Sequence, residues 1–127
     1  MPTDLIYKGA KFEVYAWTEN DGCPVLEFLE NLQKDGNPDG VRLMNLIRRT
    51  ADLGPLFNIR HCRRLEDDIF EFKAPNTGRI FFFYDRGRMI ICTHGVSGKK
   101  GSEAAFIRRQ IIKAAEIRAR YISSRRG

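Results

Sequence analysis

The sequence contains no apolar run of 18 or more residues, so no segment reaches the length that a membrane-spanning helix requires. The first residues also lack the apolar centre of a secretory signal, and we expect a cytoplasmic protein without a membrane partner. Cysteine is scarce, and Cys23, Cys62 and Cys92 form no CxxC pair or cysteine–histidine cluster. This spacing predicts neither zinc nor a disulfide framework and favours small reduced side chains in or near the core.

Acidic residues are scarce in the second part of the chain. Residues 1–72 contain 9 Lys/Arg and 13 Asp/Glu, whereas residues 73–127 contain 13 Lys/Arg and only 3 Asp/Glu. The net charge of +6 therefore divides into −4 and +10. This asymmetry indicates a surface that holds a polyanion, the alternative being a basic helix kept for solubility. The basic part has no carboxylate cluster with metal-ligand spacing, so we do not expect a two-metal nuclease. We predict no metal and no other cofactor.

Periodicity in the first half of the chain predicts one strand and two helices. Residues 12–17 alternate as a strand does, and two helices with apolar stripes follow, the first starting at Pro24 and the second stopped by Gly54-Pro55. The stripes are Val25, Phe28, Leu29 and Leu32 in the first helix and Leu43, Leu46, Ile47 and Ala51 in the second. Four β-rich segments separated by turn residues then predict an antiparallel meander of three or four strands, at residues 61–65, 69–74, 79–84 and 88–94.

A glycine- and lysine-rich loop at residues 95–101 leads into a last helix, which we expect to begin after Ser102 and to end near Ser123. Consecutive helices exclude an alternating parallel α/β design. We predict a single α+β domain over residues 1–127, with a helical hairpin on one face of an antiparallel sheet and a C-terminal helix. The predicted buried stripe of that helix consists of Ile107, Ile111, Ala114, Ala115 and Ile122.

Strand parity brings charge and aromatic rings to one face of the meander. If Lys73 pairs with Arg79, both cations lie on the face away from the helical hairpin, together with Phe81 and Phe83. Rings that stack bases beside cations that hold phosphates are what single-stranded RNA requires. Two alternatives stay open: burial of both rings under the last helix, and an ion pair between Arg79 and Glu71.

Other candidate residues lie around this face. Lys99 and Lys100 are expected near its rim, and Tyr121 either presents its phenol there or packs in the core. His61 and His94 are the only histidines and have the chemistry of a general base and acid, but nothing in their spacing brings them together. The remaining candidates for RNA contact are Arg88 and Arg108.

Several short motifs follow one another between residues 22 and 121. The motifs are Gly22-Cys23-Pro24-Val25 with Phe28-Leu29, Leu53-Gly54, Leu65 before Ile69-Phe70-Glu71-Phe72-Lys73, Gly78-Arg79-Ile80-Phe81-Phe82, His94-Gly95 before Lys99-Lys100, and a helix with Ile111, Ala114 and Tyr121. With these motifs in this order, the chain resembles the RelE/ParE superfamily of toxins, in its phage-derived, HigB-like branch.

The resemblance implies a RelE-like β-α-α-β-β-β-α fold and a toxin that inhibits translation. Such toxins cleave messenger RNA without a metal, typically on the ribosome, by attack of the ribose 2′-OH on the adjacent phosphate. An antitoxin, often a helix-turn-helix protein, neutralises them. Two other functions remain alternatives: a ParE-like toxin that poisons DNA gyrase without nuclease activity, and a non-toxic nucleic-acid-binding regulator.

The resemblance also assigns roles to residues. Arg79 would stabilise the charge of the phosphorane, whereas Lys73 stands where many relatives have arginine and lacks its forked grip on phosphate. Lys99 and Lys100 match a lysine pair, and Tyr121 matches a C-terminal aromatic position. The predicted catalytic residues are Arg79, Lys73, Lys99 and Tyr121, and the predicted RNA-binding residues are Lys100, Phe81, Phe83, Arg88 and Arg108.

Overall fold

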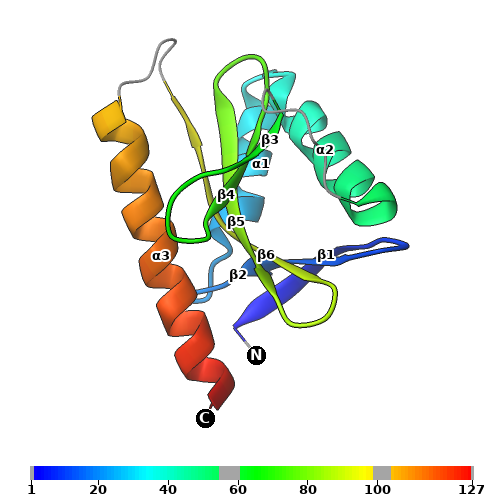
Figure 1. Cartoon of the computed structure of the whole chain (residues 1–127). Coiled ribbons are helices and arrows are strands. Elements are labelled where there is room, and N and C mark those ends of the chain that lie inside the picture. Colours follow the sequence, from blue (N-terminus) through cyan, green and yellow to red (C-terminus); the bar gives the residue numbers. More distant parts are fainter. Residues whose placement is uncertain (1, 55–60, 99–103, 127) are drawn as a thin grey trace.

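The computed structural model describes residues 2–54, 61–98 and 104–126. Figure 1 shows helices α1 and α2 on one side of a sheet and the long helix α3 on the other. None of the described helices is long and apolar enough to cross a membrane. The elements are β1 (Thr3–Lys8), β2 (Glu13–Trp17), α1 (Pro24–Lys34), α2 (Asp39–Leu53), β3 (Cys62–Arg64), β4 (Phe70–Lys73), β5 (Gly78–Asp85), β6 (Met89–Ser97) and α3 (Ala104–Arg126).

The sheet has six described strands in the order β1-β2-β6-β5-β4-β3. The α+β class and the meander from β3 to β6 are confirmed. The expectation of a purely antiparallel sheet is wrong, because β2 runs parallel to β6, with Val14 opposite Ile90. Strand β1 was not predicted: it lies at the sheet edge, where Leu5 is 54% exposed, so its sequence carries no alternating pattern.

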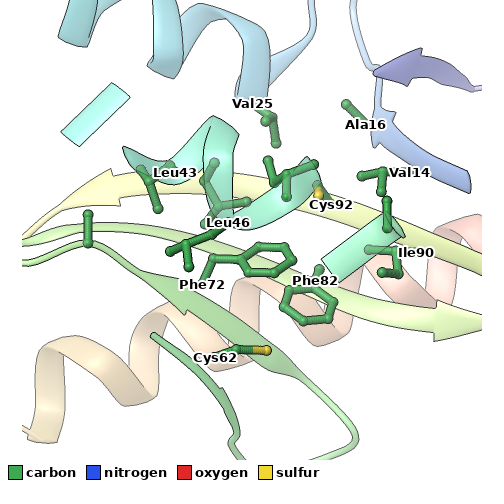
Figure 2. Close-up of a cluster of buried hydrophobic side chains, with 14 of the residues drawn as sticks. Val14, Ala16, Val25, Leu43, Leu46, Cys62, Phe72, Phe82, Ile90 and Cys92 are labelled. Atoms are coloured by element: carbon green, nitrogen blue, oxygen red, sulfur yellow. The ribbon is translucent and has the colours of Figure 1, made fainter. Parts of the chain in front are cut away.

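The helical hairpin covers one face of the sheet. The predicted stripes are confirmed, since α1 and α2 bury residues at helical spacing against Phe72 and Phe82, whose rings stack with centroids 4.2 Å apart. Figure 2 shows this cluster, with side chains of α2 packed against the strands. The residues that α1 and α2 bury from the predicted stripes are Val25, Leu32, Leu43, Leu46, Ile47 and Ala51.

Helix α3 covers the opposite face. It buries one row, Ile111, Ala114, Ile117 and Tyr121, against strand residues that include Phe81 and Phe83. Ile107, Ala115 and Ile122, expected in that row, are only half-buried. The buried row instead continues through Ile117 and Tyr121, and Ile107 and Ile122 pack against its margin.

The predicted loop at residues 95–101 begins later than expected, since β6 continues to Ser97. Gly95 lies opposite Ile80 in the sheet, and a Cβ at this position would lie 2.2 Å from the Phe28 ring of α1. The glycine therefore serves close packing between strand and helix rather than loop flexibility.

Asp39, at the start of α2, is fully buried and is tied to the turn between β4 and β5. Its carboxylate accepts hydrogen bonds from the backbone N–H groups of Gly78 at 2.8 Å and Asn76 at 3.2 Å. A Cβ on Gly78 would lie 3.0 Å from the Asp39 carboxylate, so this close contact favours glycine. The hydrogen bonds fix the turn that connects Lys73 to Arg79.

Candidate functional site

Lys73 and Arg79 are direct neighbours on adjacent strands. Lys73 of β4 pairs with Arg79 of β5 in the register that strand parity predicts, on the sheet face away from the helical hairpin. The neighbouring residues on the hairpin side, Phe72 and Ile80, belong to the core beneath α1 and α2. The helical hairpin therefore does not cover the sheet face that carries Lys73 and Arg79.

An open cavity of about 720 Å³ lies between this face and the beginning of α3. Five of its lining residues are cationic, and Glu66 is its only acidic lining residue among those that the structure describes. Its apolar wall comes from Leu65 and from the first turns of α3, including Ile107 and Ile111. The cationic lining residues are Arg63, Arg64, Lys73, Arg79 and Arg108.

Glu71 connects two of these cations beneath the cavity. Its side chain is completely buried, and its Oε1 accepts a hydrogen bond from Nη1 of Arg79 at 3.0 Å. Its other oxygen, Oε2, accepts a hydrogen bond from Nε of Arg63 on β3. The ion pair of Arg79 with Glu71, one of the two alternatives that the sequence left open, is therefore present.

Phe81 and Phe83 do not face the cavity. Their exposed fractions are 0% and 1%, and both pack under α3 against Ile111, Ala114 or their neighbours. The predicted stacking of RNA bases on these rings is therefore wrong for this structure, because neither ring surface is accessible. Burial under the last helix, the other open alternative, is what the structure shows.

Tyr121 lies at the other end of β5 from Arg79. Its phenol donates a hydrogen bond to Asp85 at 2.5 Å, and its ring contacts Phe83 and Trp17 edge-on. Arg79 and Asp85 are six positions apart on one strand, which corresponds to about 20 Å. The expected catalytic role of Tyr121 beside Arg79 is therefore not supported, because the residue packs in the core instead.

The hydrogen bonds around Asp85 also shift two pKa values. Burial raises the pKa of the Tyr121 phenol, and the bond to Asp85 raises it further. Burial opposes ionisation of Asp85, but bonds from Tyr121, the Arg86 amide and Arg125 outweigh it and hold the pKa of this carboxyl below its usual value. Both shifts favour a neutral phenol on a charged carboxylate, a stable structural contact at neutral pH.

His94 is a buried residue that packs between β5 and α3. Its ring stacks on Phe81 with centroids 5.0 Å apart, Nδ1 lies 2.9 Å from the Thr93 hydroxyl, and Nε2 lies 3.0 Å from the side-chain oxygen of Gln110. Burial lowers the pKa of His94 to about 4. The imidazole ring is therefore uncharged at neutral pH and cannot act there as an imidazolium general acid.

The remaining predicted residues divide between the cavity and other places. Arg108 lines the cavity and lies 3.6 Å from Glu66. Arg88 is exposed on the turn between β5 and β6, at the end of the sheet opposite the cavity, so it does not share a site with Arg79. Lys99 and Lys100 lie outside the described residues.

Arg63 and Arg64 were missed by the sequence analysis, although both line the cavity. A signal was available, since Arg63 alternates with the buried Cys62 and lies opposite Glu71. Strand parity would have placed it on the same face as Lys73. Among the described residues, no three His, Cys, Asp or Glu side chains gather as the ligands of a metal would.

The side chains that line the cavity are suited to binding an anion. Guanidinium and ammonium groups on one wall form charge-assisted hydrogen bonds to phosphate oxygens, and the single acidic lining residue does not neutralise them. A family model described as "Phage derived protein Gp49-like (DUF891)" matches residues 27–119, which include every residue named above as lining the cavity. No curated protein matches the chain.

Proposed function

The chain belongs to the Gp49-like family of phage-derived proteins, a toxin-like family, and we propose that it is a metal-free mRNA endoribonuclease. Within the RelE/ParE superfamily, the order of its sequence motifs favours the HigB-like branch. The proposed protein is the toxin of a toxin–antitoxin pair and inhibits translation by cleaving messenger RNA, most effectively on the ribosome. Its place of action is then the cytoplasm, where mRNA and ribosomes meet.

One observation carries this proposal: Lys73 and Arg79 are paired across two strands at an open cavity whose described lining contains five cations. A backbone phosphate of RNA is the ligand that such a lining attracts, because phosphate accepts forked hydrogen bonds from arginine and a point-charge contact from lysine. With the two rings buried, we infer that the protein binds mainly the backbone and that base selection comes from elsewhere, such as the ribosome.

The proposed reaction needs no group beyond RNA, water and the protein. The 2′-oxygen bonds to phosphorus as its proton passes to water, and the bond from phosphorus to the 5′-oxygen breaks. The leaving oxygen takes a proton, which we assign to the ammonium of Lys73, while Arg79 stabilises the charge of the phosphorane. The products are a 2′,3′-cyclic phosphate and a free 5′-OH. Lys99 and Lys100 remain in the proposal as further substrate contacts.

The test is a translation reaction supplied with purified protein, in which primer extension maps the ends of the mRNA. The proposal predicts new 5′ ends with the wild-type protein. It also predicts that Arg79→Ala lowers the cleavage rate by roughly two orders of magnitude or more, as the loss of an oxyanion donor does. Intact mRNA at doses of wild-type protein that arrest growth would contradict the nuclease proposal.

Arg49→Ala is the matched control for this test. Arg49 is exposed on α2, which packs on the opposite face of the sheet from the cavity, and its loss changes the net charge as Arg79→Ala does. Cleavage by this variant should equal that of the wild type. Growth arrest that a neighbouring antitoxin gene reverses would support the toxin–antitoxin part of the proposal.

A further inference from the structure

We propose that Arg63 binds the same RNA phosphate as Arg79 and that Glu71 is the positioning residue that holds both guanidinium groups for it. This inference rests on the proposed function and deepens it. It makes Arg63 a substrate-binding residue, a role that no sequence motif predicted. The juxtaposition that carries it is one buried carboxylate shared by two arginines at one cavity.

The two oxygens of the Glu71 carboxylate bind two different arginines. Glu71 is the middle residue of three on adjacent strands, since it pairs with Arg63 on β3 and with Phe81 on β5. Each carboxylate oxygen accepts one guanidinium N–H, from Arg63 and from Arg79, and the side chain is 0% exposed. A buried carboxylate with charged donors on both oxygens fixes the planes of both guanidinium groups.

The charge around Glu71 does not cancel. One carboxylate faces two guanidinium groups, and Lys73 lines the same cavity. A purely structural ion pair would be complete with a single arginine, and each extra buried or half-buried cation carries a desolvation cost. A second positive group at this position is explained if an anion shares the site and contributes the missing negative charge.

The two arginines approach the cavity from different depths. The side chain of Arg63 is 38% exposed and uses Nε for Glu71, and its two terminal NH₂ groups make no hydrogen bond to another described residue. The side chain of Arg79 is only 9% exposed, and its Nε is buried without a hydrogen-bond partner among the described residues. Donors from both sides can thus reach two different oxygens of one phosphate.

This arrangement also explains how a lysine is tolerated at position 73. Lysine provides charge but no fork of donors, and a fork supplied from the adjacent strand by Arg63 restores two-pronged recognition of phosphate. Arg63 then binds substrate, Arg79 stabilises charge in the transition state, and Glu71 acts only through these two residues.

The test measures binding and cleavage separately. A fluorescent RNA oligonucleotide with 2′-O-methyl groups cannot be cleaved by 2′-OH attack, so its affinity reports binding alone. Arg63→Ala should weaken this affinity by about tenfold and reduce the slope of log affinity against log salt by about one. Arg49→Ala, which loses the same charge on the opposite face, is the control. Equal affinities for Arg63→Ala and Arg49→Ala would overturn the inference.

Glu71→Gln separates positioning from folding. The substitution keeps the shape but removes one negative charge, so RNA affinity per folded molecule should stay equal or rise, while kcat for mRNA cleavage falls by about tenfold because the guanidinium planes are no longer fixed. A merely structural role would lower both readouts in proportion to the folded fraction measured by circular dichroism. If Glu71→Gln does not fold, the RNA affinity of Arg63→Ala still tests the inference, because Arg63 is half-exposed and its loss should leave the protein folded.

The outcomes distinguish this inference from the proposed function. Wild-type protein that cleaves mRNA, together with an Arg63→Ala variant that binds and cleaves normally, overturns the role of Arg63 and leaves the nuclease proposal standing. Wild-type protein that binds the uncleavable RNA but cleaves no mRNA contradicts the nuclease proposal, while loss of binding in Arg63→Ala still supports the shared phosphate site. Wild-type protein without affinity for RNA overturns both.

Discussion

The two ends of strand β5 lie under the same helix and both bring arginine to a carboxylate, yet one end is open and the other is closed. At the first end, Arg79 and its partner Glu71 lie beside a cavity that is lined by four further cations among the described residues. At the last end, Asp85 receives bonds from Tyr121 and Arg125, and aromatic rings close the space around them.

This difference shows that the positive residues in the basic part of the chain have two roles: some hold α3 on the sheet, and others line the cavity. Towards its C-terminus, α3 uses arginines to hold itself on the sheet: Arg118 lies 5.8 Å from the Phe83 ring centre, and Arg120 lies 5.8 Å from that of Trp17 and bonds to Glu19. Such contacts between cations and rings stabilise packing. Near the first end of β5, the cations line a cavity instead, so net charge alone cannot identify a binding site.

Replacing Phe83 should produce the largest effect, at the closed end. Phe83→Ala removes a ring that is 1% exposed under α3, and we expect the free energy of unfolding to fall by about 3–5 kcal/mol. Urea unfolding followed by circular dichroism measures this loss. RNA affinity per folded molecule should not change. A variant of full stability that binds RNA more weakly would instead place the ring in the binding site and break the comparison.

The free energy of unfolding, measured as a function of pH, should report the protonation of His94. This residue lies opposite Phe81, between the two ends of β5. Its pKa is lowered to about 4 in the folded protein, below the value of about 6.5 in an unfolded chain, so the unfolded chain binds the proton more readily. The contribution of His94 is therefore complete above pH 6.5 and is lost as the pH falls towards 4, by about 3 kcal/mol in total.

The control for this titration is His94→Gln, which retains hydrogen-bonding groups but does not titrate. Its unfolding free energy should lack the part of the acid-induced decrease between pH 6.5 and 4 that the imidazole causes. Identical pH profiles of the two proteins would mean that His94 is protonated without cost, in conflict with its burial beneath α3.

Tyr121→Phe should give the smallest effect. The change removes the hydrogen bond to Asp85 but keeps the ring, and Arg125 still contacts the carboxylate, so we expect a loss of about 1–2 kcal/mol in stability. The rate of mRNA cleavage, measured by primer extension at a temperature where the variant is folded, should equal that of the wild type. A strong loss of cleavage without loss of stability would return Tyr121 to the candidate site.

The sequence predicted the parts of the fold that depend on local patterns. The apolar stripes of α1 and α2 and the register of Lys73 with Arg79 follow from periodicity over a few residues, and both are present. The parallel pairing of β2 with β6 could not be found in this way, because it joins segments more than 70 positions apart. Strand β1 has an exposed edge and therefore no alternation to detect.

For the candidate site, too, local patterns predicted one part, and long-range packing decides the rest. Parity identified the face of Lys73 and Arg79, but parity cannot decide whether that face is covered, and α3 buries Phe81 and Phe83 while leaving the cavity beside Arg79. The position of α3 depends on long-range packing and not on its own sequence pattern. Arg63 was overlooked because its own strand, β3, is only three residues long.

The buried carboxylate of Asp39 has a consequence for the order in which the molecule folds. Its hydrogen bonds to Asn76 and Gly78 join residues 37 and 39 positions apart, and contacts over such separations form only when the chain closes a long loop, at a cost in entropy. The turn between β4 and β5 therefore reaches its final shape when α2 docks. A partly folded chain carries the same positive residues, but Lys73 and Arg79 face each other at a formed cavity only in the finished protein.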